Sequence, residues 1–306
     1  MQAGISFPLV SFSKGSTITE QNSAPGKYFY VIQSGTVSVL DMDIEKDAPD
    51  DKTLLGIGDF FSVETVLTNS FERITAIAET DVTAIAVTKE ALPAFIKENL
   101  PVSTKILHYL SKRLHYLNEK KYNDNKKTSP THGLSHLYNF GKFYLKRNLF
   151  RTAYCAFHQY LEHCPTGKNV ENARRHIEKL ASYSSGLRFD YDDREITRIY
   201  PIDSVIFFEK EPSRGMFVLR SGSVKMTRII DDKEVTLAVL KAGDIAGQMG
   251  LIDTKPRSAT AIACEDCEII AIAHTAYLPI LRDGAHILSR ICITLSERIA
   301  KHYESI

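Results

Sequence analysis

Short runs of β-branched and aromatic residues, broken by glycines, dominate the first hundred residues of the chain. Such runs cover Tyr28–Val31, Thr36–Leu40 and Ile74–Val87, and Ser34-Gly35 between the first two is typical of a hairpin turn. Apolar residues then recur at helical spacing, at Ile106, Leu110, Leu114 and Leu117. This pattern predicts a small antiparallel β-roll followed by a long amphipathic helix.

The same pattern occurs a second time nearer the C-terminal end. GDFFSVETVLTNSFERITAIA begins at Gly58, and GDIAGQMGLIDTKPRSATAIA begins 185 positions later, at Gly243. YVIQSG from Tyr30 is matched by FVLRSG from Phe217, and a second helical stripe runs through Ile287, Ile291, Leu295 and Ile299. Because several blocks match in one order, we expect a duplicated domain.

A helical segment is predicted between the two copies. It follows the polar stretch 123–133, which has the composition of a linker. Its pattern resembles one tetratricopeptide repeat, in which two antiparallel helices pack closely because small residues, here Gly141 and Ala153, stand where they meet. The positions that carry the resemblance are Leu137, Phe140, Gly141, Tyr144, Ala153, Phe157, Tyr160 and Pro165. A third helix is expected near Val170–Ala181. The segment is either a spacer packed on the rolls or a docking surface for a protein partner.

The predicted fold class is α+β. Two antiparallel, jelly-roll-like β-roll domains with flanking helices are joined by a helical hairpin segment. The expected domains are residues 1–122, the linker and helical segment 123–185, and residues 186–306.

Composition excludes several classes of protein. Of 306 residues, 43% are hydrophobic and 25% are charged, which excludes wholesale disorder. The net charge of +1 gives no overall field for a nucleic acid or a membrane. No apolar stretch is long enough to span a bilayer, and Met1–Phe12 does not have the pattern of a secretory signal. The five scattered cysteines are typical of a cytoplasmic protein with reduced thiols.

Other features of the sequence indicate no further chemistry. Cys264-x-x-Cys267 lies in a strand region without a second paired motif, so neither a metal nor a cofactor is predicted. Residues 101–150 carry a formal balance of +8, which we interpret as a solvated face rather than a nucleic-acid site. No helix-turn-helix is expected after the last helix, so DNA binding is not predicted. The chain also lacks the common catalytic signatures, and no enzyme is expected.

The segment from Gly243 to Ala263 has the residues that an anion site needs. Gly247 and Gly250 allow close approach of the backbone, and Arg257 supplies a planar, permanently charged fork suited to phosphate oxygens. With this segment, both copies resemble cyclic nucleotide-binding domains, the family of catabolite-activator-type regulators, protein kinase A regulatory subunits and gated channels. The phosphate-binding cassette of that family, F-G-E-x-A-L and then R-[ST]-A-T, is matched by A-G-Q-M-G-L from Ala246 and R-S-A-T from Arg257.

The resemblance implies a role for each position of the second copy. Arg257 would pair with the cyclic phosphate, Gly250 and Ser258 would donate to it, and Gln248 stands where the family has a Glu that holds the ribose 2′-hydroxyl. A neutral amide there is a weaker acceptor than a carboxylate. The predicted ligand-binding residues are Gly247, Gln248, Met249, Gly250, Leu251, Arg257, Ser258 and Ala259, and the expected ligand is cyclic AMP or cyclic GMP.

The first copy departs further from the family. Glu72 stands at the Arg position, Arg73 at the Ser position and Val63 at the ribose position. A carboxylate repels a phosphate in a low-dielectric pocket. Arg73 is expected to point to the opposite face if it lies in a strand, unless a bulge turns it back. We therefore expect that the first copy does not bind a cyclic nucleotide in the usual way.

The sequence thus predicts a non-enzymatic second-messenger sensor that relays to a protein partner. The helix Ala285–Tyr303 is expected to close over the second roll, with Arg290, Thr294 and Glu297 on its polar face, and the long helices are expected to form a homodimer seam. Two alternatives stay open: an interaction scaffold that binds no ligand, and a sensor of another ligand such as a cyclic dinucleotide.

Overall fold

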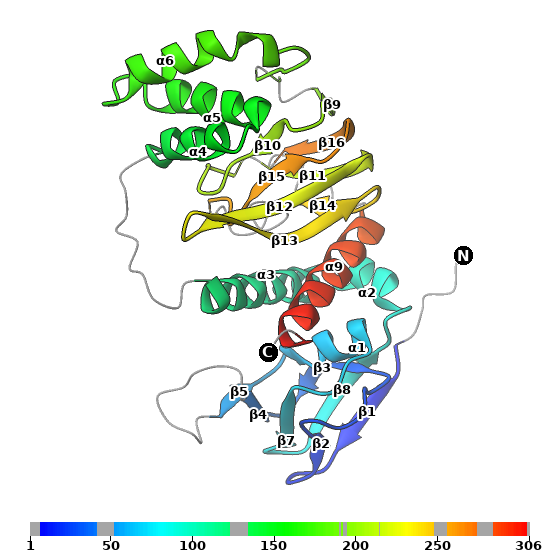
Figure 1. Ribbon diagram of the computed structural model, residues 1–306. Coiled ribbons are helices and arrows are strands. Elements are labelled where there is room, and N and C mark those ends of the chain that lie inside the picture. Colours follow the sequence, from blue (N-terminus) through cyan, green and yellow to red (C-terminus); the bar gives the residue numbers. More distant parts are fainter. Residues whose placement is uncertain are drawn as a thin grey trace, which may run out of the picture. The chain divides into compact units, whose positions relative to one another are not determined.

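The computed structural model describes residues 7–41, 52–122, 134–189, 191, 195–213, 215–247, 256–273 and 284–304 (Figure 1). The chain divides into two compact units. The first unit comprises Met1–Leu117 together with Leu278–Ile306, and the second comprises Asn118–Tyr277.

The first unit contains a β-roll made of two four-stranded sheets. Their strand orders are β1-β8-β3-β6 and β2-β7-β4-β5, and the described strand pairs are antiparallel. Alternate residues face inward and bury Ile32, Val37, Phe61 and Ala76 between the sheets. The strands are β1 (Leu9–Phe12), β2 (Thr17–Thr19), β3 (Phe29–Ser34), β4 (Val37–Asp41), β5 (Thr53–Leu55), β6 (Phe60–Phe61), β7 (Ile74–Ala78) and β8 (Val82–Val87).

Four helices complete the first unit: α1 (Val63–Thr68), α2 (Leu92–Glu98), α3 (Leu100–Tyr122) and α9 (Ala285–Glu304). Helix α9 packs against α1 and α2 (Figure 1). The sequence alone placed this helix with the second roll, whereas its contacts group it with the first. Its apolar stripe predicted a buried face correctly, but a stripe does not specify which surface it covers.

The predicted dimer seam is already covered within the chain. Ile106 and Leu110 of α3 and Leu295 and Ile299 of α9 are buried. A homodimer through these two helices therefore stays a prediction that this structure does not support.

The second unit contains a roll of the same construction. Its sheets have the orders β14-β11-β16-β9 and β10-β15-β12-β13. The strands are β9 (Thr197–Tyr200), β10 (Val205–Phe207), β11 (Gly215–Ser221), β12 (Ser223–Ile230), β13 (Lys233–Lys241), β14 (Ile245–Ala246), β15 (Thr260–Ala263) and β16 (Cys267–Ala273). The predicted α+β fold with two antiparallel rolls is confirmed.

Equivalent glycines form a turn between the two sheets of each roll: Gly35 joins β3 to β4, and Gly222 joins β11 to β12. The hairpin predicted at Ser34-Gly35 was wrong, because β3 and β4 lie in different sheets and do not pair with each other. Gly35 and Gly222 both adopt left-handed backbone, with φ of 88° and 85°. A Cβ at Gly35 would clash with the carbonyl oxygen of Asp81, and one at Gly222 would lie 2.6 Å from that of Asp266. These turns require glycine, which explains why the two copies share it.

The helical segment belongs to the second unit. It comprises α4 (His136–Lys146), α5 (Phe150–His163), α6 (Val170–Lys179) and a short 3₁₀ turn, η1 (Ala181–Tyr183). The expected close packing of α4 and α5 is observed, because a Cβ at Gly141 would lie 2.5 Å from the Phe157 ring. Phe208 and Ile262 of the second roll share the core of these helices. The likeness to a tetratricopeptide repeat stays a prediction.

Candidate functional site

A glycine and an arginine meet at the end of β14. Gly247 adopts left-handed backbone with φ of 73°. The Arg257 Nη1 donates to its carbonyl oxygen at 2.9 Å, and a Cβ at Gly247 would clash with that nitrogen. Position 247 therefore requires glycine both for its conformation and for the space that the guanidinium occupies.

Arg257 is a buried cation on an aromatic platform. The residue is 7% exposed, and its guanidinium carbon lies 4.3 Å from the centroid of the Phe207 ring and 5.4 Å from that of Phe217. Burial lowers the pKa of Arg257 to about 10, against the opposing effect of Glu211. The side chain thus remains charged at neutral pH.

The guanidinium has unused capacity to donate. In the described part of the chain, Arg257 Nε has no hydrogen-bond partner and the guanidinium forms no ion pair. The Glu211 carboxylate offsets only part of the cost of burying this charge, and an anion in front of the guanidinium would offset more of it. The residues present therefore fit an anionic ligand.

The structure describes four of the eight predicted ligand-binding residues. It brings together Gly247 and Arg257, and it places half-buried Ser258 and buried Ala259 immediately before β15. Four predicted residues lie outside the described ranges: Gln248, Met249, Gly250 and Leu251. On α9, Arg290 and Glu297 are exposed and Thr294 is half-buried.

The first roll holds a cavity of about 340 Å³. Strands β4, β5 and β7 and helices α1 and α3 contribute to its wall. Leu55, Phe61 and Ile74 give it apolar surface, and four carboxylates and three cations also line it. This cavity lies at the place in the first copy that corresponds to the cassette of the second.

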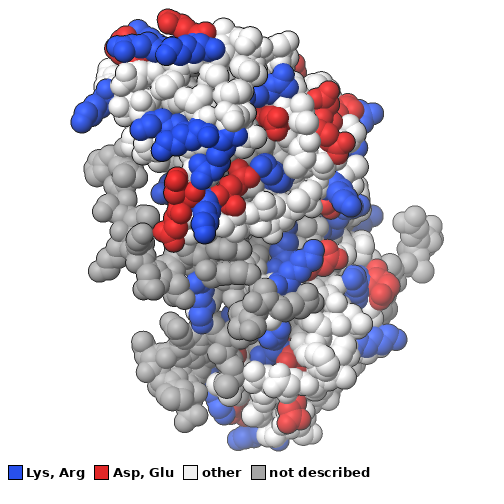
Figure 2. Space-filling view, viewed as in Figure 1, with Lys and Arg blue, Asp and Glu red and all other residues white. Residues whose placement is uncertain are grey.

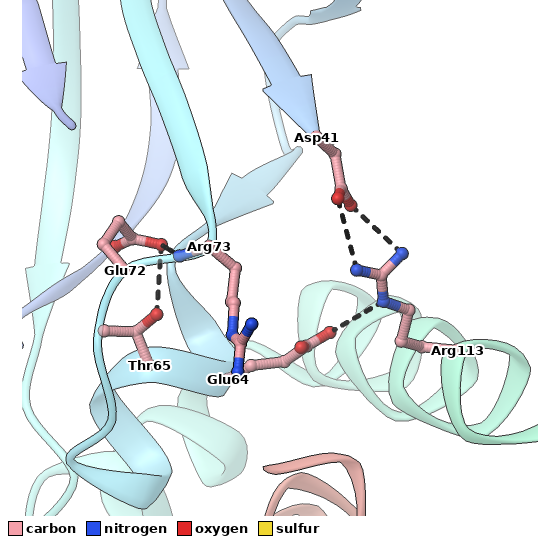
Figure 3. Close-up of polar contacts among 6 residues, drawn as sticks. All are labelled: Asp41, Glu64, Thr65, Glu72, Arg73 and Arg113. Atoms are coloured by element: carbon pink, nitrogen blue, oxygen red, sulfur yellow. Dashed lines mark hydrogen bonds and ion pairs between the residues drawn. The ribbon is translucent and has the colours of Figure 1, made fainter. Parts of the chain in front are cut away.

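Arg113 of α3 lies between two carboxylates in this wall (Figure 3). Its Nη1 and Nη2 lie 3.1 and 3.3 Å from the two carboxylate oxygens of Asp41, and its Nε lies 3.7 Å from Glu64 Oε1. Burial by itself lowers the pKa of Arg113, but Glu64, Tyr109 and Asp41 outweigh it, so the pKa lies above its ordinary value. The cation of Arg113 is therefore already neutralised by the chain.

Glu72 turns its carboxylate inward at the same wall. It is 3% exposed, and its Oε1 accepts hydrogen bonds from the Thr65 hydroxyl and from the Arg73 backbone N–H, each at 3.0 Å (Figure 3). The prediction for Arg73 applied only to a residue within a strand, and this condition is not met, because β7 begins at Ile74. Strand alternation does not apply to Arg73, and its side chain lines the cavity, with its guanidinium carbon 3.8 Å from the Tyr303 ring centroid.

Sequence reasoning missed the ion pairs of Arg113. A signal was present, because position 113 follows Leu110 by three residues and precedes Leu117 by four, which places it on the apolar face of α3. A cation on a buried face needs a partner from another element. Sequence spacing does not reveal that the partners are Asp41 and Glu64.

The basic stretch is partly neutralised within each unit. Lys105 pairs with Asp59 at 3.3 Å, and Arg147 lies 4.0 Å from Asp232. On the face shown in Figure 2, Lys and Arg side chains are interspersed with Asp and Glu. This is the pattern of a mixed solvated surface.

The two cysteines of the Cys264-x-x-Cys267 motif differ in burial. Cys264 is exposed, whereas Cys267 is buried and its Sγ donates to the Ser223 carbonyl oxygen at 3.2 Å. Within those residues no group of three or more His, Cys, Asp or Glu side chains could hold a metal ion. The helices of the same ranges include none with the length and apolarity that crossing a membrane needs.

A family model, the cyclic nucleotide-binding domain, matches residues 9–99 and 197–283, together more than half of the chain. The chain belongs to the cyclic nucleotide-binding domain family.

Individual relatives are regulators. The "Cyclic AMP receptor protein" of Thermus thermophilus is 32% identical over 121 residues, 39% of this chain and 55% of that protein. A "cAMP-dependent protein kinase regulatory subunit" of Pyricularia oryzae is 24% identical over 120 residues, 39% of this chain and 30% of that protein. The chain thus spans about half the length of the first relative and less than a third of the length of the second.

Solved structures are similar as well. The Thermus thermophilus Catabolite Activator Protein has a TM-score of 0.33 and 29% identity, over 39% of this chain and 58% of that one. The structure described as "cAMP bound PfPKA-R (141-441)" has a TM-score of 0.29 and 19% identity, over 96% of this chain and 80% of that one. Because both scores are below 0.5, the family assignment rests on the sequence match.

Proposed function

We propose that this chain is a non-enzymatic regulator whose second roll binds a cyclic nucleotide, cyclic AMP or cyclic GMP, and relays the bound state to a protein partner. The observation that carries the proposal is the buried Arg257 guanidinium beside Gly247. The helical segment α4–α6, which shares its core with the second roll, is the surface that we assign to the partner.

The chemistry of the site favours a phosphate. A guanidinium presents its N–H groups as a planar fork that matches two oxygens of one phosphate. Arg257 uses Nη1 on the Gly247 carbonyl and has Nε without a partner among the residues described. The Phe207 and Phe217 rings shield the guanidinium from water, which strengthens its attraction for an anion.

Isothermal calorimetry with cyclic AMP and cyclic GMP tests the proposal. We expect one ligand per chain and a loss of affinity of at least about 30-fold in Arg257→Glu, the effect of breaking a buried charge pair. Arg220→Glu is the matched control, because Arg220 lies in the same roll but is exposed and pairs with Glu268 at 2.8 Å. It should bind like the wild type.

The result that overturns the proposal is equal affinity for the wild type and Arg257→Glu. Binding that survives in Arg257→Glu with a cyclic dinucleotide would instead favour a different ligand class.

An interaction scaffold without a ligand is the second candidate. The observation that favours it is Gln248, which stands where the family has a carboxylate for the ribose. It predicts no heat with any cyclic nucleotide, while the wild-type chain still captures a protein partner. Loss of that capture when the exposed face of α6 is altered would then identify the surface used.

A further inference from the structure

We propose that the first roll contains an anion site that is occupied by the chain's own Glu72 carboxylate. This inference concerns the first roll alone and goes beyond the function proposed for the second. It rests on three observations: the equivalence of two backbone positions, the donors that meet the carboxylate, and the burial of the group.

Glu72 and Arg257 occupy equivalent places in the two rolls. Their positions differ by 185, as do the positions of the two repeat blocks. The Glu72 N–H donates to the Ser23 carbonyl oxygen at 3.1 Å, and the Arg257 N–H donates to the Glu211 carbonyl oxygen at 2.9 Å. The return bonds match too, from Asn22 N–H to Glu72 O at 2.8 Å and from Lys210 N–H to Arg257 O at 2.7 Å.

The donors around Glu72 stand at the positions expected to hold the ligand phosphate. By the same spacing, Thr65 corresponds to Gly250 and Arg73 to Ser258, the two residues that the family resemblance assigns to phosphate binding. In the first roll, the Thr65 hydroxyl and the Arg73 N–H both donate to Glu72 Oε1 at 3.0 Å. One carboxylate oxygen therefore accepts hydrogen bonds from the same two chain positions, here from the Thr65 hydroxyl and the Arg73 N–H, whereas Gly250 can donate only its backbone N–H.

The Glu72 carboxylate is also buried. At 3% exposure, the Glu72 carboxylate is removed from bulk water, and the two hydrogen bonds replace part of its hydration. A second anion at this place would meet both steric overlap and like-charge repulsion. The first roll therefore excludes a phosphate without any ligand being present.

Chemical rescue distinguishes an anion site from an ordinary buried glutamate. Glu72→Ala removes the carboxylate and leaves both donors, so acetate or inorganic phosphate should enter the vacated place. Glu72→Gln is the matched control, because its amide oxygen fills the same space and accepts the same two bonds. The full-length chain is used with Arg257→Glu in every sample, so that the second roll offers no cationic site to the added anion.

The measurements are the thermal midpoint and hydrogen exchange of residues 63–78. With acetate at a few times its dissociation constant, we expect the midpoint of Glu72→Ala to rise by about 2 °C relative to chloride at equal ionic strength. Protection of the segment 63–78 should rise in parallel. Glu72→Gln, the chain with native Glu72, and acetamide in place of acetate should show no such rise.

An acetate effect on Glu72→Ala that is no larger than on Glu72→Gln would overturn the inference. If Glu72→Ala does not fold in chloride, recovery of folded protein by refolding in acetate supports the inference, and failure in both salts refutes it. Because no cyclic nucleotide is used, a negative result leaves the proposal for Arg257 unaffected.

Discussion

Replacing Arg113 by methionine should strongly destabilise the first unit. The Arg113 side chain is 4% exposed, and those of its partners Asp41 and Glu64 are 9% and 11% exposed. Methionine preserves most of the apolar stem of the side chain and removes the charge. The variant therefore removes the cation that lies between two largely buried carboxylates.

The expected loss of unfolding free energy in Arg113→Met follows from the burial of the ion pair. Removing one partner of a buried ion pair costs about 3–5 kcal/mol, because the remaining charge loses its compensation. For a unit of this size, each kcal/mol lowers the thermal midpoint by roughly 2–4 °C, so a decrease of about 6–20 °C is expected. Adding Asp41→Asn to Arg113→Met should restore part of the loss, since one of the two carboxylates that faced Arg113 is then replaced by a neutral amide.

Urea unfolding and differential scanning calorimetry measure the effect, and α3 supplies a matched control. Lys105→Met makes the same replacement on the same helix, but Lys105 and Asp59 have side chains that are 55% and 40% exposed. An exposed pair contributes about 0–1 kcal/mol. If Arg113→Met loses no more free energy of unfolding than Lys105→Met, the assignment of Arg113 as a buried structural cation is wrong.

Two further predictions concern the helical segment. Gly141→Ala should destabilise it by about 1–2 kcal/mol in urea unfolding, because overpacking against the Phe157 ring exceeds the gain in helix propensity. Phe157→Leu in the same chain should reduce that loss, and an unchanged stability would contradict the packing. Burial lowers the pKa of His158, with Glu162 opposing, so the unfolded chain binds more protons below pH 6.5 and stability falls on acidification. His158→Phe should therefore flatten the pH dependence of the thermal midpoint between pH 5 and 7, and an unchanged slope would refute it.

The duplication was predictable because glycines and short apolar runs are local signals. Gly58 and Gly243 were matched by position alone, and in the structure each adopts left-handed backbone, with φ of 78° and 89°. The Gly58 N–H donates to the carbonyl oxygen of Ile32 in β3 at 2.9 Å, and the Gly243 N–H donates to that of Leu219 in β11 at 2.6 Å. A turn of this kind restricts the residue type so strongly that the sequence records it.

Long-range partners were not predictable in the same way. The stripe on α9 predicted a buried face, and Leu295 and Ile299 are indeed buried, but the sequence placed the helix with the second roll, whereas its contacts group it with the first. An apolar face is compatible with any complementary apolar surface. For Arg73 the outcome depended on a strand boundary that the sequence does not fix, and β7 begins one residue after it, at Ile74.

The pair Glu72 and Arg257 reverses the charge at one position that the two rolls share. The backbone frames of Glu72 and Arg257 make the same pair of hydrogen bonds, so the fold does not decide which charge is placed there. With a carboxylate, the position is satisfied internally by Thr65 and Arg73. With a guanidinium, it keeps an Nε without a partner among the described residues. Because the backbone hydrogen bonds at this position are the same, the difference between an internally bonded carboxylate and a guanidinium that fits an anion arises there from the side chain and not from the fold.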